Sequence, residues 1–260
     1  MKNRFVSTLL KSRSILLLVG AVSLLAGCGR SDKVYPDRAG SLVGIDGRNP
    51  LPREIYDQSA NDASVKLAAD GTTSRSLAIQ LKSDAGITNR ALLGLSAFDE
   101  EKLDVLDGIT FDSKIQSGSS NASVILVVDL NCSRANRKIR VVTATNDRLA
   151  AGVDQSNGYK RFTANFNAAI WTTMGDQPIT DNGTILVPEV SAAPVSLADL
   201  IASTQKGVCV VNAKSGDKAL PNVETSGILL SLSSATKSEL FINRITVGTK
   251  IIDEKTWGQQ

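Results

Sequence analysis

Histidine is absent from all 260 residues of this chain. Its absence excludes Ser-His-Asp and Cys-His nucleophilic sites, histidine-ligated zinc and the commonest general base. Aromatic residues are also scarce, at 4% of the chain, so few rings are available to stack on a ligand. Carboxylate pairs such as those within 100–107 would suit a glycosidase, but they lie in a turn or helix start where solvated acids are expected. We therefore expect a protein that is not an enzyme.

The first 27 residues have the pattern of a secretory signal. Basic residues but no acid precede an apolar run over 15–27, which is too short to cross a hydrocarbon core of about 30 Å. The run ends in Leu25-Ala26-Gly27-Cys28, which resembles the lipobox of bacterial lipoproteins. The resemblance implies that Cys28 carries a lipid, becomes the new N-terminus and anchors the chain in a membrane. Because Gly29 rather than Asp follows, it favours the cell outer membrane.

Removal of the signal changes the charge of the protein. The net charge of +3 includes four signal cations, so the chain from Cys28 onward has 25 basic and 26 acidic residues. This balance argues against nucleic acid as a partner. A local basic group within 134–140 is interpreted as a solvated loop and strand edge. Residues 28–61 are rich in proline and glycine and are expected to form a tether, and 62–260 a single domain.

Two further cysteines, Cys132 and Cys209, would meet an oxidising compartment after export. An even pair beyond the lipidated cysteine predicts one disulfide. Each lies in a strand-like run, so the bond would join two strands far apart in sequence, adding about 4 kcal/mol on the chain-entropy model. Two unpaired buried cysteines are the alternative. Neither lies in a Cys-x-x-Cys motif, which argues against thiol redox catalysis.

Short alternating apolar runs dominate the chain after residue 62 and predict strands. The longest, over 124–132, is apolar at intervening positions too and predicts a central strand. A capping-box pattern at Ser196-Leu197-Ala198-Asp199 predicts a short helix ending near residue 206, and 97–106 is either a second helix or an ordered loop. Together these features predict an all-β jelly-roll β-sandwich with one or two short helices. The other predicted strands are 77–81, 109–115, 138–145, 159–166, 208–211, 228–232 and 239–247.

The order of these elements resembles bacterial jelly-roll domains of the carbohydrate-binding-module type. The segments that carry the resemblance are 106–112, 123–130, Gly158-Tyr159 before Trp171, and the closing runs 227–232 and 241–247. The resemblance implies glycan binding, in which pyranose rings stack on exposed aromatics. Trp171 and Tyr159 are the one plausible pair for such a platform. A fold resemblance does not transfer a ligand, however.

The partners that this interpretation implies are a membrane, through the lipid, and a polysaccharide or an envelope protein. A structural or protein-interaction module without a small ligand is the alternative. We expect no cofactor. Several carboxylates are available to a structural calcium ion, but none forms a dense Asp-x-Asp-x-Asp loop. The simpler interpretation is that they are isolated acids in turns. These acids are Asp129, Asp147, Asp217, Asp253 and Glu254.

Overall fold

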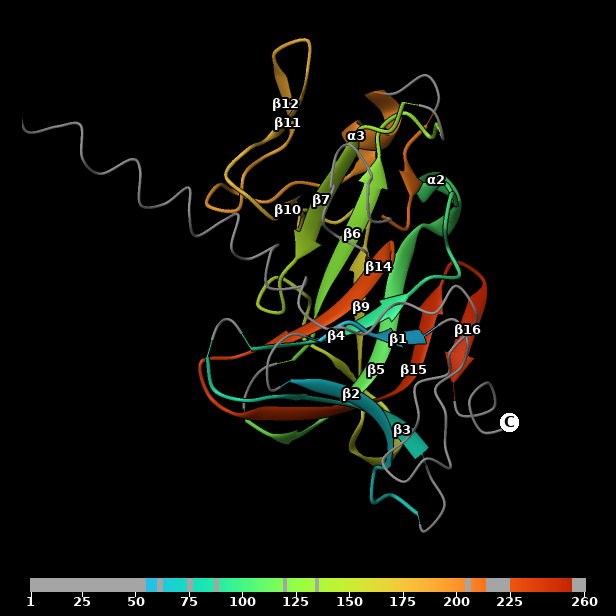
Figure 1. The fold of residues 1–260 in the computed structure, drawn as a ribbon, viewed down its shortest axis with the longest axis vertical. Coiled ribbons are helices and arrows are strands. Elements are labelled where there is room, and N and C mark those ends of the chain that lie inside the picture. Colours follow the sequence, from blue (N-terminus) through green and yellow to red (C-terminus); the bar gives the residue numbers. More distant parts are fainter. Residues whose placement is uncertain are drawn as a thin grey trace, which may run out of the picture.

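The computed structural model describes residues 55–59, 63–73, 77–86, 89–118, 121–133, 136–203, 207–213 and 225–253. Within these ranges the chain forms two large antiparallel sheets and a few short helices (Figure 1). The predicted signal, Cys28 and most of the predicted tether lie outside the described residues. No helix in the described part of the chain is long and apolar enough to cross a membrane.

The described strands fall into two seven-stranded sheets and one hairpin. Sheet A has the spatial order β1 (Ile55–Asp57), β4 (Arg90–Leu95), β14 (Ile228–Ser233), β6 (Ser123–Asp129), β7 (Ile139–Ala144) and β10 (Thr172–Thr173), and β13 (Cys209–Val210) also pairs with β6. Sheet B has the order β2 (Ser64–Ala69), β3 (Leu77–Ser83), β15 (Ser238–Val247), β5 (Gly108–Ser117), β9 (Lys160–Asn165) and β8 (Val153–Asp154), and β16 (Lys250–Asp253) also pairs with β15. The other elements are the hairpin of β11 (Ile179–Asp181) and β12 (Thr184–Val187), the helices α2 (Leu103–Leu106) and α3 (Ala198–Ser203), and the 3-10 turn η1 (Ser156–Gly158).

The connectivity is that of a jelly roll. Eight strands form its two four-stranded halves, in the orders β4-β14-β6-β7 and β3-β15-β5-β9. Along the chain these eight strands alternate between the sheets, except at the β6–β7 pair, as two Greek keys require. The predicted all-β jelly-roll sandwich with short helices is therefore confirmed.

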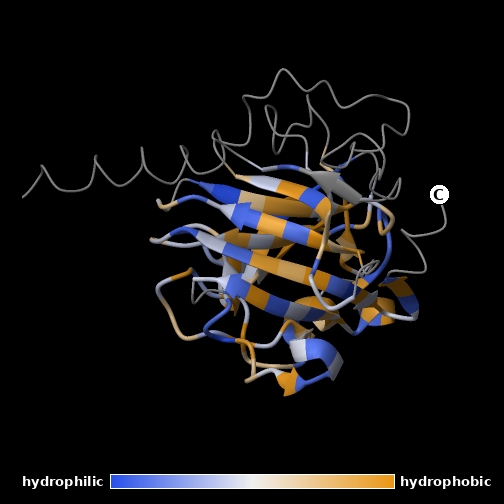
Figure 2. Cartoon of the chain, turned by 90° about the horizontal axis from the view of Figure 1, so that it is seen from below, coloured by the Kyte–Doolittle hydropathy of each residue, from blue (hydrophilic) through white to orange (hydrophobic). Residues whose placement is uncertain are grey.

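Alternating side chains place the main core between the two sheets. In β6, Val124, Leu126 and Val128 pack into that core, whereas Ile125 and Val127 join smaller buried clusters on the opposite face. Figure 2 shows hydrophobic and hydrophilic residues alternating along other strands of the sheets. Because β6 is buried on both faces and paired along both edges, the prediction of a central strand is confirmed.

The edge of β6 that lies opposite β7 pairs with two strands in succession. Residues 123–126 pair with β14, and then Val128 and Asp129 pair with Val210 and Cys209 of β13. Sheet B has the same feature, because β15 pairs first with β3 and then with β16. These changes of partner leave β13 and β16 beside the ends of the central strands.

Some element bounds differ from those expected. Helix α3 begins at Ala198, after the proposed capping residue Ser196, and only the last four residues of 97–106 form a helix. Strand β1 lies inside the segment expected to be a tether and pairs with β4. Sheet A therefore begins at residue 55, ahead of the predicted domain boundary at residue 62.

Candidate functional site

A pocket of about 250 Å³ lies at the end of β6, where three segments distant in sequence meet. Glu100 and Lys102 belong to the segment between β4 and α2. The β6–β7 loop contributes Cys132, Ser133 and Arg137, and β13 and the residue after it contribute Cys209 and Val211. The pocket therefore depends on the tertiary fold rather than on any one sequence motif.

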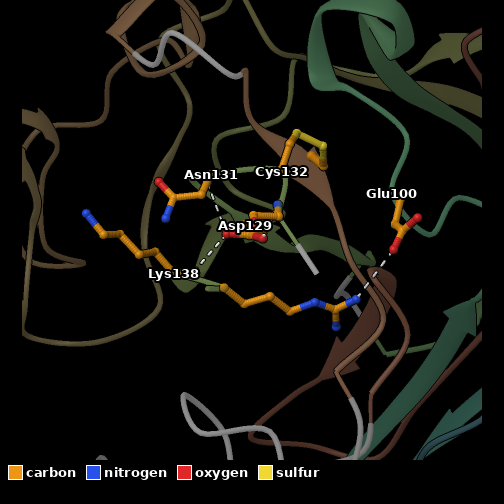
Figure 3. The surroundings of a disulfide bond; sticks show 8 residues. Glu100, Asp129, Asn131, Cys132 and Lys138 are labelled. Carbon is orange, nitrogen blue, oxygen red and sulfur yellow. Dashed lines mark hydrogen bonds and ion pairs between the residues drawn. A yellow bond between two sulfur atoms is a disulfide. The ribbon is translucent and has the colours of Figure 1, made fainter. Parts of the chain in front are cut away.

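The Cys132–Cys209 disulfide predicted from the sequence is present and lines the pocket (Figure 3). The two Cα atoms lie 5.2 Å apart, and the bond joins residues separated by 77 positions. Cys209 also pairs with Asp129 in the sheet and forms an isolated bridge with Lys102. The disulfide thus fastens the β6–β7 loop to β13 beside the segment that carries Lys102.

Asp129 also lines the pocket, and it organises the β6–β7 loop there. Its side chain is fully buried, and one carboxylate oxygen accepts hydrogen bonds from the backbone amides of Asn131 and Lys138, at 3.0 and 2.8 Å. The other oxygen accepts from the amide of Ser133 at 3.0 Å. Hydrogen bonds from amides to a carboxylate are strong and satisfy donors that would otherwise be buried without partners. Because both oxygens are occupied in this way, Asp129 shapes the loop.

Among the described residues, the acids considered as calcium ligands do not gather around Asp129. Within the described ranges, the structure has no group of three or more His, Cys, Asp or Glu side chains arranged to hold a metal ion. Asp147 and Asp253 lie in other parts of the fold, in the β7–β8 connection and at the end of β16. Asp217 and Glu254 lie outside the described residues.

Arg137 supplies a guanidinium to the pocket. Its side chain is 17% exposed, and Nη2 lies 3.7 Å from Oε1 of Glu100. Nη1 donates to the carbonyl of Asn212 at 3.3 Å. Asn212 is fixed in turn. Its backbone amide donates to Oδ1 of Asp99 at 2.7 Å, and its side-chain Oδ1 accepts from the backbone amide of Gly227, also at 2.7 Å. This network holds Arg137 against the β4–α2 segment and the start of β14.

The pocket combines an apolar wall with a polar rim. The disulfide and the buried Val211 form the wall. Lys102 and Arg137 provide cationic donors, Glu100 a carboxylate and Ser133 a hydroxyl. Convergent donors and acceptors beside an apolar surface suit a small ligand that has hydroxyl groups on its edges and C–H groups on one face.

Both side chains of the aromatic pair predicted as a stacking platform are buried. Trp171 is 0% exposed, and its Nε1 donates to the carbonyl of Asn165 at 2.9 Å while its ring packs edge-on against Phe166. Tyr159 is 1% exposed, and its hydroxyl donates to Oδ2 of Asp70 at 2.6 Å. A sugar needs an exposed ring face, so neither residue offers the expected platform.

The residues of the pocket were only partly visible in the sequence. Arg137 belongs to the basic group interpreted as a solvated edge, whereas the structure holds it, largely buried, in the pocket. Arg140 fits the earlier interpretation, since it is exposed and its Nη1 donates to the neighbouring carbonyl of Ile139. The feature of the sequence that could have identified Arg137 as a pocket residue was its position shortly after Cys132, within the loop that the disulfide fixes.

No family model matches this chain, and no curated protein matches it either. Among solved structures, the chain is similar to the family 11 carbohydrate-binding module of the cellulosomal cellulase Lic26A-Cel5E of Clostridium thermocellum. That alignment has a TM-score of 0.38 and 12% identity, and it covers 82% of this chain and 97% of the module.

The chain is also similar to a family 11 carbohydrate-binding module from Clostridium thermocellum in complex with a β-1,3-1,4-mixed-linked tetrasaccharide. The TM-score is 0.37 with 12% identity, over 75% of this chain and 89% of that one. Similarity at this level does not assign a ligand. The jelly-roll assignment rests on the strand order, and the proposals below rest on the residues of this chain.

Proposed function

We propose that this protein is a non-enzymatic, lipid-anchored protein of the bacterial cell envelope whose jelly-roll domain binds a saccharide in the disulfide-lined pocket. The observation that carries the proposal is the convergence of Lys102, Arg137 and Glu100 around the wall formed by the disulfide and Val211. Sugars present apolar C–H faces and polar edges, so one sugar residue matches both surfaces. Binding here relies on hydrogen bonds and one apolar wall instead of aromatic stacking.

The size of the pocket limits the mode of binding. At about 250 Å³ it lies just below the usual volume of ligand pockets, which is about 300 to 1,000 Å³. This volume suits one terminal or branching sugar residue better than an extended chain. A pocket of this kind would recognise a chain end on a larger polysaccharide.

The test of saccharide binding uses the purified protein on a glycan array, followed by calorimetric titration with each glycan that binds. We expect Arg137→Gln and Lys102→Gln to weaken binding by about 10-fold or more, since a hydrogen bond to a charged group contributes about 1.5 to 3 kcal/mol. Arg140→Gln is the matched control, because Arg140 is an exposed arginine of β7 outside the pocket. Thermal unfolding of each variant checks that the fold is retained.

Two results would count against saccharide binding in this pocket. One is the absence of binding to any polysaccharide or oligosaccharide tested. The other is binding that Arg140→Gln weakens as much as Arg137→Gln does, because this would indicate nonspecific attraction to cationic side chains.

The anchor is proposed from the lipobox resemblance at Leu25-Ala26-Gly27-Cys28. A thioether-linked lipid on Cys28 with at least one further acyl chain would give stable membrane attachment, since a single chain binds only marginally. With Gly29 after the cysteine, we propose the outer membrane as the location. Metabolic labelling with palmitate should mark the wild type and not Cys28→Ser, and label retained by the variant would contradict the assignment.

A structural or protein-interaction module of the envelope is the second candidate. The burial of Trp171 and Tyr159 favours it, because neither ring presents an exposed face to a glycan. Crosslinking in intact cells should then yield a specific adduct with an envelope protein. The absence of a specific adduct would count against this candidate.

A further inference from the structure

The disulfide that lines the pocket joins two cysteines of unequal exposure. Cys209 of β13 is 4% exposed, whereas Cys132, in the β6–β7 loop, is partly exposed. Both residues line the pocket of about 250 Å³. A small molecule in the pocket therefore meets the S–S bond, and Cys132 is the more accessible end of that bond. Accessible disulfides are the ones that exchange most readily with thiols.

Cys132 has a backbone conformation that is uncommon for a residue with a side chain. Its φ is 42°, in the left-handed region. The carboxylate of Asp129 accepts the backbone amides of Asn131 and Ser133, the two neighbours of Cys132 (Figure 3). Residues held in such conformations by their surroundings are concentrated at functional sites. The loop thus presents Cys132 to the pocket by means of Asp129, and it does not depend on the disulfide for this.

The other end of the bond is also held without the disulfide. Cys209 pairs with Asp129 in sheet A. The next residue, Val210, donates from its amide to the carbonyl of Glu101 and accepts at its carbonyl from the amide of Glu100, each at 2.8 Å. Cleavage of the S–S bond therefore leaves both sulfurs where they can join again.

Cationic side chains lie beside the bond. Lys102 is opposite Cys209 in an isolated antiparallel bridge, and residues paired in this way have their side chains on the same face. Lys102 and Arg137 both line the pocket. Nearby cations stabilise a cysteine thiolate, which is the leaving group in disulfide exchange. Because Arg137 is engaged by Glu100, we expect Lys102 to be the residue that stabilises a thiolate of Cys209.

We propose that the Cys132–Cys209 disulfide is an exchange site for low-molecular-weight thiols such as glutathione. The thiolate of the small molecule attacks Sγ of Cys132, a new S–S bond forms between them, and Sγ of Cys209 leaves as a thiolate. A second small thiolate attacks the sulfur of the first, and Cys132 leaves as a thiolate in turn. Two small thiols are thereby oxidised to one small disulfide, the protein disulfide is reduced, and the two protons pass to the cysteines.

This exchange is a reversible modification of the protein and not catalytic turnover. It is therefore consistent with the lack of a Cys-x-x-Cys motif in the sequence. It does not rest on saccharide binding and would stand if the pocket bound no sugar.

The first experiment incubates the purified, oxidised protein with reduced glutathione in neutral buffer. Free thiols are then alkylated, and mass spectrometry of the peptides identifies the labelled cysteines. We expect Cys132 and Cys209 to become labelled without urea, at a rate that rises in proportion to the glutathione concentration. Urea below the unfolding transition should not change this rate, whereas reduction that required opening of the fold would accelerate with urea.

Variants test the role of each residue. Lys102→Gln should slow the reduction severalfold, and Arg140→Gln, which changes an exposed arginine outside the pocket, should leave the rate unchanged. With oxidised glutathione, Cys209→Ser should form a mixed disulfide on Cys132 several times faster than Cys132→Ser forms one on Cys209. Circular dichroism of each variant verifies folding.

Three results would overturn the exchange site. They are reduction of the wild type only in urea that unfolds the domain, equal rates of reduction in Lys102→Gln and Arg140→Gln, and a mixed disulfide that forms on Cys209 at least as fast as on Cys132. Glycan titration measures saccharide binding in the same pocket separately. The failure of either proposal is therefore distinguishable from the failure of the other.

Discussion

The hydroxyl of Tyr159 donates a 2.6 Å hydrogen bond to Oδ2 of Asp70, joining the residue before β9 to the residue after β2. The Tyr159 ring packs with Ala68, Ala78 and Phe241 in a small cluster apart from the main core. Ala78 alternates with the core residue Ile79 of β3, so this cluster lies on the outer face of sheet B. Tyr159 therefore connects segments 89 positions apart across that face.

Tyr159→Phe should destabilise the domain. Asp70 would keep its hydrogen bonds from Thr72 but lose the one that the phenol donates to this buried carboxylate. The expected loss is about 1 to 3 kcal/mol in the free energy of unfolding. Urea denaturation measures it, and saccharide affinity at the pocket should not change. A loss below about 0.5 kcal/mol would mean that water replaces the phenol.

Removal of the disulfide should lower both stability and affinity at the pocket. The bond links positions 77 residues apart, and a loop of that length corresponds to about 4 kcal/mol on the chain-entropy model. The Cys132→Ser, Cys209→Ser double variant should therefore unfold at a lower urea concentration. The pairing of β13 with β6 should persist, so the native fold should remain.

Treatment of the wild type with a reductant provides the control for this prediction. It should reproduce the stability of the double variant without changing any side chain other than the two cysteines. If the reduced wild type and the variant both unfolded at the same urea concentration as the oxidised protein, the disulfide would not contribute to stability.

The sequence was most informative where a pattern is local. The period of two over 124–132 identified β6, and the two cysteines that follow the predicted signal and Cys28 identified the disulfide. Strand β4 escaped notice because its sequence is apolar at nearly every position and five of its six residues are buried. A strand covered on both faces loses the alternation that distinguishes it from a buried helix.

The site was less predictable because its groups meet only in the folded chain. The buried hydroxyl of Tyr159 has its partner in Asp70, 89 positions away. No spacing rule links these two residues. Arg137 and Glu100 meet because β13, whose Cys209 forms the disulfide, lies between their two segments. The bulge at Asn243 was not predictable either, because it appears only in the register between β15 and β5.

Asp129→Asn should loosen the β6–β7 loop. An asparagine keeps one acceptor oxygen but replaces the other with an NH2 group, which cannot accept from the amide of Ser133 or Asn131. We expect a loss of about 1 to 3 kcal/mol in stability and weaker saccharide binding, because Ser133 and Arg137 lie in this loop. Hydrogen exchange of the Ser133 amide should accelerate, and unchanged exchange would contradict the role of the carboxylate.

The Asp112–Arg161 pair is best tested with a double-mutant cycle of Asp112→Asn and Arg161→Gln, measured by urea unfolding. The Arg161 side chain is 36% exposed, so solvent screens the pair and the expected coupling is about 1 kcal/mol. Asp112 raises the pKa of Arg161 through its hydrogen bond and its charge. The stabilisation from this shift is complete below the unfolded-state pKa of the arginine and declines only as pH rises through the raised folded-state pKa. The coupling should therefore stay constant between about pH 7 and pH 10, where arginine remains protonated. A coupling that fell across this range would mean that another titrating group controls the pair.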